Sequence, residues 1–280
     1  MTELRILVIE HERGTGPERF GDWLIEAGAD LEIRRPHLGE PIPDDLAGYA
    51  GLIVLGGASG PCDDAENPWF PQVRDLLRRS AAGEFASFDI CLGGEMLAVA
   101  TSAAIGRRTR PQIGVYQLHV TSAGEADPVF GVLGGGGSAG PNRAGETSAG
   151  SDPAAPSFPA VLFHQEQMDL PEGAQLLVTG SDAPVQAFRV GECAWGTQFH
   201  PETDAEQIAR WLDSDSLPLP EGKTKESIIA EAAAADGELI AVHRRLAHSF
   251  VAYLRSSHRL TDHTDHTEEI PAVGEGSRIR

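Results

Sequence analysis

The sequence predicts an α/β fold in which a mostly parallel central sheet is flanked by helices and followed by a C-terminal helical extension. Short β-branched or apolar runs alternate with segments of helical periodicity in the first third of the chain. That alternation is typical of a parallel sheet covered on both faces. Further along, several short strands are separated by turn residues, which indicates a second half rich in hairpins.

The elements of the first part follow one another as strand and helix. In the segment 16–28, Phe20, Trp23 and Leu24 share one helical face, and Gly28 suits a C-terminal cap. The segment 48–57 is a buried run closed by two glycines. The predicted strands are 4–10, 31–37, 48–57 and 85–91, and the predicted helices are 16–28, 69–82 and 92–104.

The second part has a different pattern. From 111 to 133 the pattern is strand-like, and short strands with intervening turns follow before a helix begins near residue 202. Only Gly, Ala, Ser and Pro are frequent in 134–157, so we expect a flexible surface loop there. The later strands are 160–166, 174–181, 184–191 and 193–202, and the later helices are 202–214 and 224–256.

These patterns divide the chain into three parts. Residues 1–212 form the predicted α/β domain, 213–258 the helical extension, and 259–280 a polar tail that we expect to be disordered. The tail lacks the apolar residues that would tie it to a core.

Charge and composition exclude several classes of protein. The 280 residues contain 42 acidic and 22 basic side chains, giving a net charge of −20, and such a surface repels nucleic acids and anionic membranes. Three cysteines do not suggest a disulfide framework, and no Cys-x-x-Cys pair suggests zinc. The acidic N-terminus does not resemble a signal peptide, and no apolar stretch approaches the roughly 20 residues of a membrane helix. We therefore expect a cytoplasmic protein without a nucleic-acid or membrane partner and without a metal.

Cys91 lies where a predicted strand meets a predicted helix, in the segment FDICLGGEMLAVA. A tight turn at that place would expose the thiol, direct backbone N–H groups at a developing oxyanion and bring the thiolate near a positive helix end. Cys91 is therefore a candidate nucleophile. A small buried thiol before a glycine turn is the alternative, and the segment alone does not exclude it.

Two further motifs lie at strand ends, where sites in parallel sheets gather. In GTQFHPE, a strand ends at His200, and Glu202 can hold the far imidazole nitrogen and fix its tautomer. In VLGGASG, Gly56 and Gly57 can present a backbone N–H to an oxyanion. The alternatives are a lone histidine at a strand end and an ordinary glycine turn.

Together these motifs resemble the class I, triad-type glutamine amidotransferases, including the amidotransferase domain of GMP synthase. The resemblance rests on LIVLGG (52–57), ICLGGEMLA (90–98) and TQFHPE (197–202), with 163–196 also similar to the family's stretch before its catalytic histidine. It covers roughly 4–212 and implies the flavodoxin-like fold of that family.

The resemblance also implies a mechanism. Cys91 would attack the side-chain amide of glutamine, His200 would shuttle protons, and Glu202 would orient His200. Backbone N–H groups of Gly57 and Leu92 would form the oxyanion hole beside Gly56. No cofactor is implied. Ammonia would be released or delivered to a separate synthase partner, and both a monomer and an oligomer remain open.

Two positions depart from the family's Gly-x-Cys-x-Gly-x-Gln elbow. Asp89 stands at the first glycine, and its charge would raise the pKa of the Cys91 thiol; Glu95 stands at the glutamine and could recognise an amine. His164, followed by Glu166, corresponds to a histidine near the family's site mouth, although a surface strand residue is the alternative. Three hypotheses remain: a glutamine amidohydrolase, a γ-glutamyl peptidase or hydrolase, and a non-catalytic ligand-binding relative.

Overall fold

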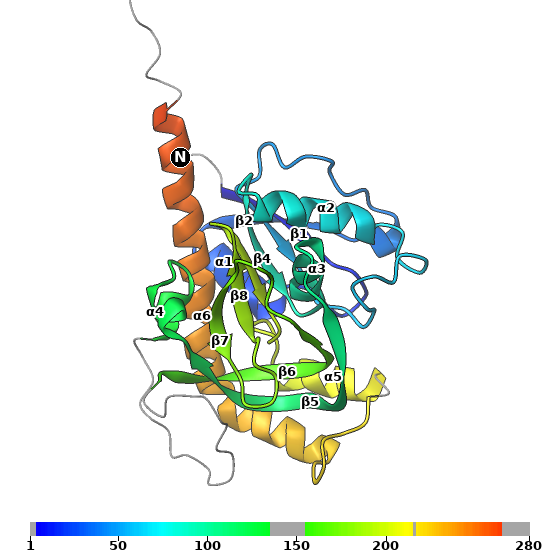
Figure 1. The fold of residues 1–280 in the computed structure, drawn as a ribbon. Helices are drawn as coiled ribbons and strands as arrows, with labels where there is room; N and C mark the ends of the chain where they lie inside the picture. Colours follow the sequence, from blue (N-terminus) through cyan, green and yellow to red (C-terminus); the bar gives the residue numbers. More distant parts are fainter. Residues whose placement is uncertain (1–3, 135–154, 215–216, 265–280) are drawn as a thin grey trace, which may run out of the picture.

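The computed structural model describes residues 4–134, 155–214 and 217–264 (Figure 1). It confirms the predicted α/β class, with a large central sheet between helices. The strands are β1 (Leu4–Ile9), β2 (Ala29–Arg34), β3 (Gly51–Val54), β4 (Ala86–Ile90), β5 (Ile105–Val120), β6 (Ser157–Met168), β7 (Gln175–Thr179), β8 (Ala187–Val190) and β9 (Ala194–Thr197). The helices are α1 (Glu18–Glu26), α2 (Phe70–Ala81), α3 (Leu92–Ala100), α4 (Ser122–Ala126), α5 (Ala205–Ser214) and α6 (Lys225–Thr264), with short 3-10 turns η1 (Pro36–Leu38) and η2 (Phe130–Leu133).

The sheet has a parallel part and an antiparallel part. Its strand order is β2-β1-β3-β4-β9-β8-β7-β5-β6. The neighbours from β2 to β9 pair in parallel, and β8, β7, β5 and β6 are added in antiparallel fashion. The C-terminal ends of β3, β4 and β9 therefore meet at one edge, which is where the three candidate motifs follow.

Two layers of helices cover the parallel part. Phe88 and Ile90 of β4 pack with apolar residues of α1 and α6, whereas Leu52 and Val54 of β3 pack with those of α2 and α3. Successive strand residues point to opposite faces, so an apolar run such as LIV in β3 contributes to both layers. In Figure 1, α2 and α3 accordingly lie on the opposite side of the sheet from α6.

The stretch after β5 differs from its prediction. Residues 121–133 do not continue the strand but form α4 and η2. Thr121 accepts a hydrogen bond from the N–H of Gly124, which caps α4, and Asp127 accepts two from the N–H groups that begin η2. Side-chain caps of this kind favour helical turns over strands. The predicted loop 134–157 falls mostly on 135–154, which lies outside the described residues.

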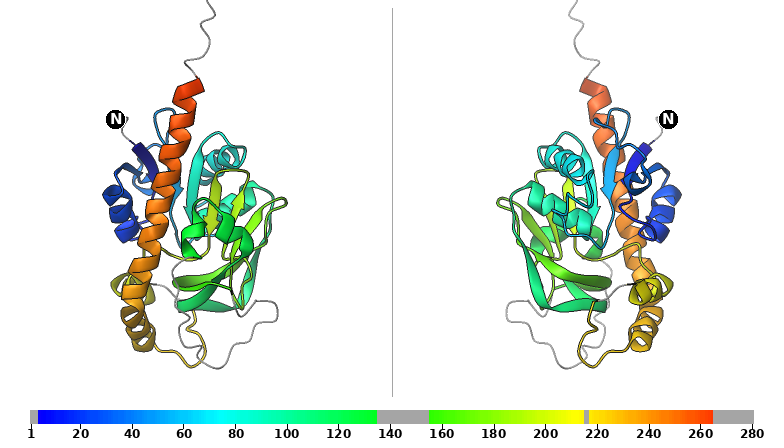
Figure 2. Two further views of the ribbon diagram at one scale, coloured as in Figure 1. Left: turned by 90° about the vertical axis from the view of Figure 1, so that its left-hand side faces the viewer. Right: turned by 90° about the vertical axis from the view of Figure 1, so that its right-hand side faces the viewer.

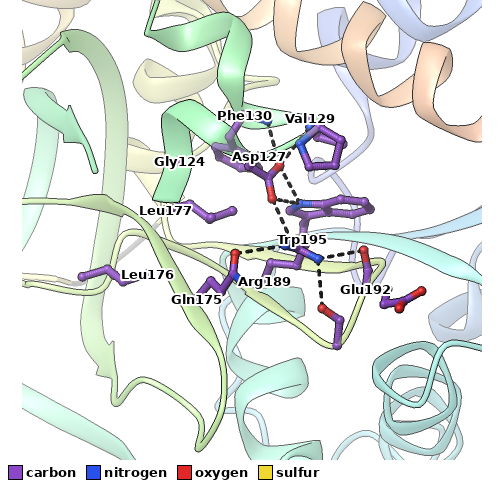
Figure 3. Close-up of polar contacts among 12 residues, drawn as sticks. Gly124, Asp127, Val129, Phe130, Gln175, Leu176, Leu177, Arg189, Glu192 and Trp195 are labelled. Atoms are coloured by element: carbon purple, nitrogen blue, oxygen red, sulfur yellow. Dashed lines mark hydrogen bonds and ion pairs between the residues drawn. The ribbon is translucent and has the colours of Figure 1, made fainter. Parts of the chain in front are cut away.

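Asp127 is also the centre of a buried polar network (Figure 3). Its carboxylate accepts hydrogen bonds from Arg189 Nε at 2.8 Å and from the indole N–H of Trp195 at 3.1 Å. Arg189 in turn donates to Gln175 at 2.9 Å and to two backbone carbonyls, of Gly191 and Glu192. The network ties η2 to β8 and β9, in the antiparallel part of the sheet.

Helix α6 covers most of the predicted C-terminal extension and continues past residue 258. Figure 2 shows it running along one side of the molecule, beside α1. Leu246, Phe250 and Leu254 on its inner face belong to the same apolar cluster as α1 and β4. The division of the chain at 212 and 258 stays a prediction, and residues 265–280 lie outside the described part. No helix in the described ranges is long and apolar enough to cross a membrane.

Candidate active site

Cys91 occupies a strained turn between β4 and α3. Its φ is 50° and its ψ −106°, a conformation that L-residues rarely adopt. The Cys91 N–H donates to the carbonyl of Thr197 on β9 at 2.8 Å, and the Cys91 carbonyl accepts from the N–H of Glu95 at 2.8 Å. Both backbone groups are thus fixed by neighbouring elements, and the turn is the elbow that the sequence predicted.

The two glycines after the elbow are explained by close packing. A Cβ on Gly93 would lie 2.2 Å from the carbonyl oxygen of Val54, and one on Gly94 would lie 2.5 Å from that of Thr197. Neither glycine has a positive φ in this structure. Both residues therefore let α3 start directly against β3 and β9, and the tight turn itself is made by Cys91.

His200 and Glu202 form the second part of the site. Nδ1 of His200 lies 2.7 Å from Oε1 of Glu202, and both side chains are buried. The His200 backbone N–H donates to the carbonyl of Val161 on β6 at 2.9 Å, which fixes the loop after β9. The ring of Trp211 on α5 packs against the imidazole with a centroid distance of 4.7 Å.

The charges of this cluster influence each other. Burial alone would lower the pKa of His200, but the Glu202 carboxylate and the Cys91 side chain outweigh it and raise that pKa to about 10. Burial raises the pKa of the Cys91 thiol, while the charge of His200 acts in the opposite direction. Nε2 of His200 has no hydrogen-bond partner within the described residues. His200 is therefore the positive group next to Cys91, and Glu202 is its counterion.

Gly56 and Gly57 lie at the end of β3, beside this cluster. A Cβ at position 56 would lie 3.2 Å from Cε1 of His200 and 3.7 Å from Cβ of Cys91, and one at 57 would lie 2.9 Å from a Leu92 methyl group. Leu92 is the first residue of α3, so its N–H has no carbonyl partner within the helix. The arrangement brings both predicted oxyanion-hole residues next to Cys91.

Glu95 is buried one helical turn after the nucleophile position. Nε2 of Gln198 donates to Oε1 of Glu95 at 3.0 Å and lies 3.7 Å from Cys91 Sγ. Burial raises the pKa of Glu95 to about 7, opposed by the hydrogen bond from Gln198 and supported by the charge of Glu166. Glu95 therefore changes its charge in the neutral pH range. The side-chain amide of Gln198 connects it to the candidate nucleophile Cys91.

Asp89 lies on the face of β4 that packs on α2, and it is fully buried. Burial raises its pKa well above the usual value, and the hydrogen bond from the Ser87 hydroxyl opposes this only in part. The groups whose charge acts on the Cys91 thiol are His200, Glu95 and Glu202. The surroundings do not support the expectation that the charge of Asp89 would raise the Cys91 pKa: burial favours the uncharged form of Asp89, and the carboxylates whose charge raises the pKa of the thiol are Glu95 and Glu202.

His164 lies on β6 and is buried rather than on the surface. Its Nδ1 is 2.5 Å from the carbonyl oxygen of Glu166, and burial lowers its pKa to about 3, with the charge of His200 acting in the same direction. Its Nε2 has no hydrogen-bond partner within the described residues. His164 is thus a neutral imidazole within electrostatic range of His200, and its Nε2 is buried.

Comparison with known proteins decides the family. The family described as glutamine amidotransferase class-I matches residues 22–212, more than half of the chain. The chain belongs to the class I glutamine amidotransferases. The match includes every candidate catalytic and oxyanion residue named above and ends before α6 begins.

Relatives of this amidotransferase share its fold at low identity. The glutamine amidotransferase-like protein YfeJ of Salmonella typhimurium is 22% identical over 228 residues, which cover 80% of this chain and 87% of that protein. A glutamine amidotransferase structure from Thermotoga maritima superposes with a TM-score of 0.72 at 22% identity, covering 90% of this chain and 99% of the other. A GMP synthase component from Thermoplasma acidophilum gives 0.59 at 17% identity, covering 94% and 99%. These likenesses establish the flavodoxin-like fold.

Sequence reasoning did not assign a role to two residues of this amidotransferase site. Gln198 lies within the quoted TQFHPE segment, but its partner Glu95 is 103 positions away, and no local pattern pairs them. Trp211 follows in α5 and carries only the periodicity of an amphipathic helix. One sequence signal could have indicated the contact of Trp211 with His200: the apolar face of the helix that follows this histidine contains a tryptophan.

The other two cysteines and an acidic run near the site lie in ordinary structural surroundings. Cys193 is buried and Cys62 is exposed. In the acidic run 63–66, Asp64 forms two hydrogen bonds with Arg74 at 2.8 and 2.7 Å, so this segment is anchored to α2. Within the described ranges, no group of three or more His, Cys, Asp or Glu could hold a metal ion.

Proposed function

We propose that this amidotransferase hydrolyses the side-chain amide of glutamine with Cys91 as nucleophile, His200 as proton shuttle and Glu202 as the group that orients His200. The observation that carries the proposal is the buried 2.7 Å contact between His200 Nδ1 and Glu202 Oε1, beside a cysteine on a strained strand-to-helix turn. A buried histidine–carboxylate pair at that place has an evident use in catalysis.

The first half-reaction forms a thioester. The Cys91 thiolate attacks the amide carbon, and the negative charge that develops on the amide oxygen is stabilised by the N–H groups of Gly57 and Leu92. The C–N bond then breaks as His200 gives its proton to the leaving nitrogen, and ammonia departs. The raised pKa of His200, about 10, makes it a proton carrier that is charged at neutral pH.

The second half-reaction hydrolyses the thioester and regenerates the free enzyme. His200, now neutral, takes a proton from a water molecule that attacks the glutamyl thioester. The C–S bond breaks, Cys91 leaves as the thiolate beside the protonated His200, and the new γ-carboxylic acid gives its proton to solvent as glutamate departs. Glu202 stays bound to His200 and stabilises the imidazolium at each stage, which is the role of the carboxylate in related triads.

Glu95 favours a second candidate substrate class. A buried carboxyl group stands where the family has an amide, and Gln198 holds it close to Cys91. A carboxylate there would bind an amine-bearing γ-glutamyl compound, so the alternative is a γ-glutamyl peptidase or hydrolase that uses the same three catalytic residues.

We also propose that the ammonia passes to a separate synthase partner. The support is the likeness to the GMP synthase component from Thermoplasma acidophilum.

The decisive experiment measures ammonia release from glutamine by the wild type and by Cys91→Ser, with a γ-glutamyl peptide in parallel. We expect Cys91→Ser to lower the turnover by at least about a thousandfold, because the alcohol is a far weaker nucleophile in a site built for a thiolate. Turnover of the peptide alone would favour the hydrolase.

Labelling distinguishes an enzyme that needs its partner from a non-catalytic relative. A thiol-directed glutamine analogue should modify Cys91 and no other cysteine. If glutamine and peptide both remain intact and the analogue leaves Cys91 unlabelled, the catalytic proposal fails.

A further inference from the structure

The loop that carries His200 and Glu202 is anchored on both sides by residues from α1 and α6. Phe199 precedes the pair and Thr203 follows it, and both are fully buried. Each makes one specific contact to a side chain from these two helices. Helix α6 lies outside residues 22–212, the part of the chain that defines the family.

The first anchor is an aromatic stack. The ring of Phe199 lies nearly parallel to that of His243 on α6, with a centroid distance of 5.7 Å and an interplanar angle of 18°. Phe158 on β6 meets both rings edge-on. Burial, with a smaller effect from the charge of Arg19, lowers the pKa of His243 to about 3, so this imidazole is neutral and packs as an aromatic ring.

The second anchor is the guanidinium group of Arg19 on α1. One terminal nitrogen donates to the carbonyl oxygen of Thr203, and the other donates to Asp236 of α6 at 2.6 Å. The guanidinium also lies 5.6 Å from the centroid of the Trp23 ring. A planar group with donors in fixed directions sets the position of the carbonyl relative to both helices, which a lysine ammonium would not.

Asp236 and His243 are seven residues apart on α6 and therefore share one face of that helix. The same face thus supplies the partner of Arg19 and the partner of Phe199. We propose that Arg19, held by Asp236, is a positioning residue for the catalytic pair, and that α6 is part of the active-site support. The proposal rests on the catalytic roles proposed for Cys91, His200 and Glu202.

The chain offers a matched control for this role. Arg244 of α6 forms an ion pair with Glu26 of α1, with Nε at 3.0 Å from Oε2. It therefore links the same two helices as Arg19 and Asp236 do, but this pair makes no contact with the loop of Thr203 among the described hydrogen bonds. Loss of the Arg244 pair tests whether a general weakening of the α1–α6 contact is enough to lower kcat and shift the alkylation profile of Cys91.

The experiment compares Arg19→Met, Arg19→Lys, Asp236→Asn and Arg244→Met, each in a Cys62→Ser background that removes the exposed thiol. Two quantities are measured: the rate of Cys91 alkylation by iodoacetamide as a function of pH, located by peptide mass spectrometry, and kcat and KM for ammonia release. Circular dichroism confirms folding.

We expect Arg19→Met to lower kcat by about 10- to 100-fold with little change in KM, because the loss of about 1 Å in positioning accuracy has that cost. The pH profile of Cys91 alkylation should shift, since His200 would sit differently relative to the thiol. Asp236→Asn should show a smaller change in the same direction, Arg19→Lys a partial recovery, and Arg244→Met the behaviour of the wild type.

Two results would overturn the proposal. One is a folded Arg19→Met protein with the alkylation profile and kcat of the wild type. The other is an equal loss in Arg244→Met, which would assign the effect to helix docking in general. If Arg19→Met does not fold, the proposal is tested by Asp236→Asn, and a folded Asp236→Asn protein with the kcat and alkylation profile of the wild type would overturn it. If the wild type releases no ammonia and the glutamine analogue does not label Cys91, the proposed reaction fails, yet the alkylation profile still tests the positioning role.

Discussion

Two buried aspartates in this molecule have opposite surroundings. Asp127 accepts hydrogen bonds from two backbone N–H groups, from Arg189 and from the Trp195 indole (Figure 3). Asp89, two residues before Cys91, accepts one from the Ser87 hydroxyl at 2.7 Å, and its Oδ1 has no hydrogen-bond partner among the residues described.

Asp127 belongs to a hydrogen-bonded network that stabilises the fold, whereas Asp89 lies at the sheet edge that carries the candidate site. Around Asp127 the carboxyl group is matched by the Arg189 guanidinium and by N–H donors, so its burial is compensated. Around Asp89 the compensation is incomplete, and burial raises the pKa of that carboxyl group well above its usual value. The unpaired acceptor nitrogen of His164 belongs to the same region of incomplete compensation.

The largest effect should come from the compensated network. Asp127→Ala leaves the Arg189 guanidinium and the Trp195 N–H buried without their acceptor, and we expect a loss of about 3–5 kcal/mol in the free energy of unfolding, measured with urea. The control is Asp75→Ala, which removes an exposed partner of Arg78 and should cost less than about 1 kcal/mol. If Asp127→Ala lowers the free energy of unfolding no more than Asp75→Ala does, the network around Asp127 does not have the stabilising role described here.

Asp89→Asn should act in the opposite direction. The folded-state pKa of Asp89 is raised, so its contribution to stability is complete below the unfolded pKa of about 4 and is lost as the pH rises towards the folded value. An amide does not titrate. The variant should therefore gain on the wild type as the pH rises, reaching about 1–3 kcal/mol, the usual cost of an uncompensated buried polar group.

Unfolding of the Asp89→Asn variant and of the wild type at pH 5 and pH 8 measures this trend. Asp75→Asn at an exposed position controls for the introduction of an amide. An advantage of Asp89→Asn that is equal at both pH values would show that the carboxyl group at position 89 is not the source.

The smallest effect concerns Glu95. Its charge raises the pKa of the Cys91 thiol, and its own pKa is about 7, so it opposes thiolate formation above neutral pH. Glu95→Gln should move the alkylation profile of Cys91 to lower pH and increase the rate near pH 8 by about two- to tenfold, at most about 1.4 kcal/mol. Cys62, which is exposed in the same chain, is the internal reference. If the ratio of the Cys91 and Cys62 alkylation rates is the same in Glu95→Gln and the wild type, Glu95 does not influence the Cys91 thiol.

The sequence was sufficient for the parts of the site that are contiguous. Gly56, Cys91 and His200 each follow a buried strand, and neighbouring parallel strands bring such ends together, so the fold class and the candidate triad could be inferred from motifs alone. The family and the fold are confirmed by comparison. The catalytic roles stay predictions that the chemistry above must test.

The parts that could not be predicted depend on partners far away in the chain. Residues 129–133 have the apolar character of a strand, and only the capping bonds to Thr121 and Asp127 show why they form a 3-10 turn. The sequence shows that Asp89 is acidic but not that its surroundings keep it neutral. Arg19 resembles any surface arginine until its contact to Thr203, 184 positions later, is known.

The position of α6 also bears on how the polypeptide is made. Its inner face completes the apolar layer over β1, β3 and β4, and its bond to Glu26 spans 218 positions of the chain. During synthesis that layer stays open to water until residues near 254 have left the ribosome. Contacts of such sequence separation make folding slow, and the exposed layer is a binding surface for chaperones in the meantime. The helix that we propose as a support for His200 and Glu202 is thus also the segment whose arrival covers the exposed apolar layer.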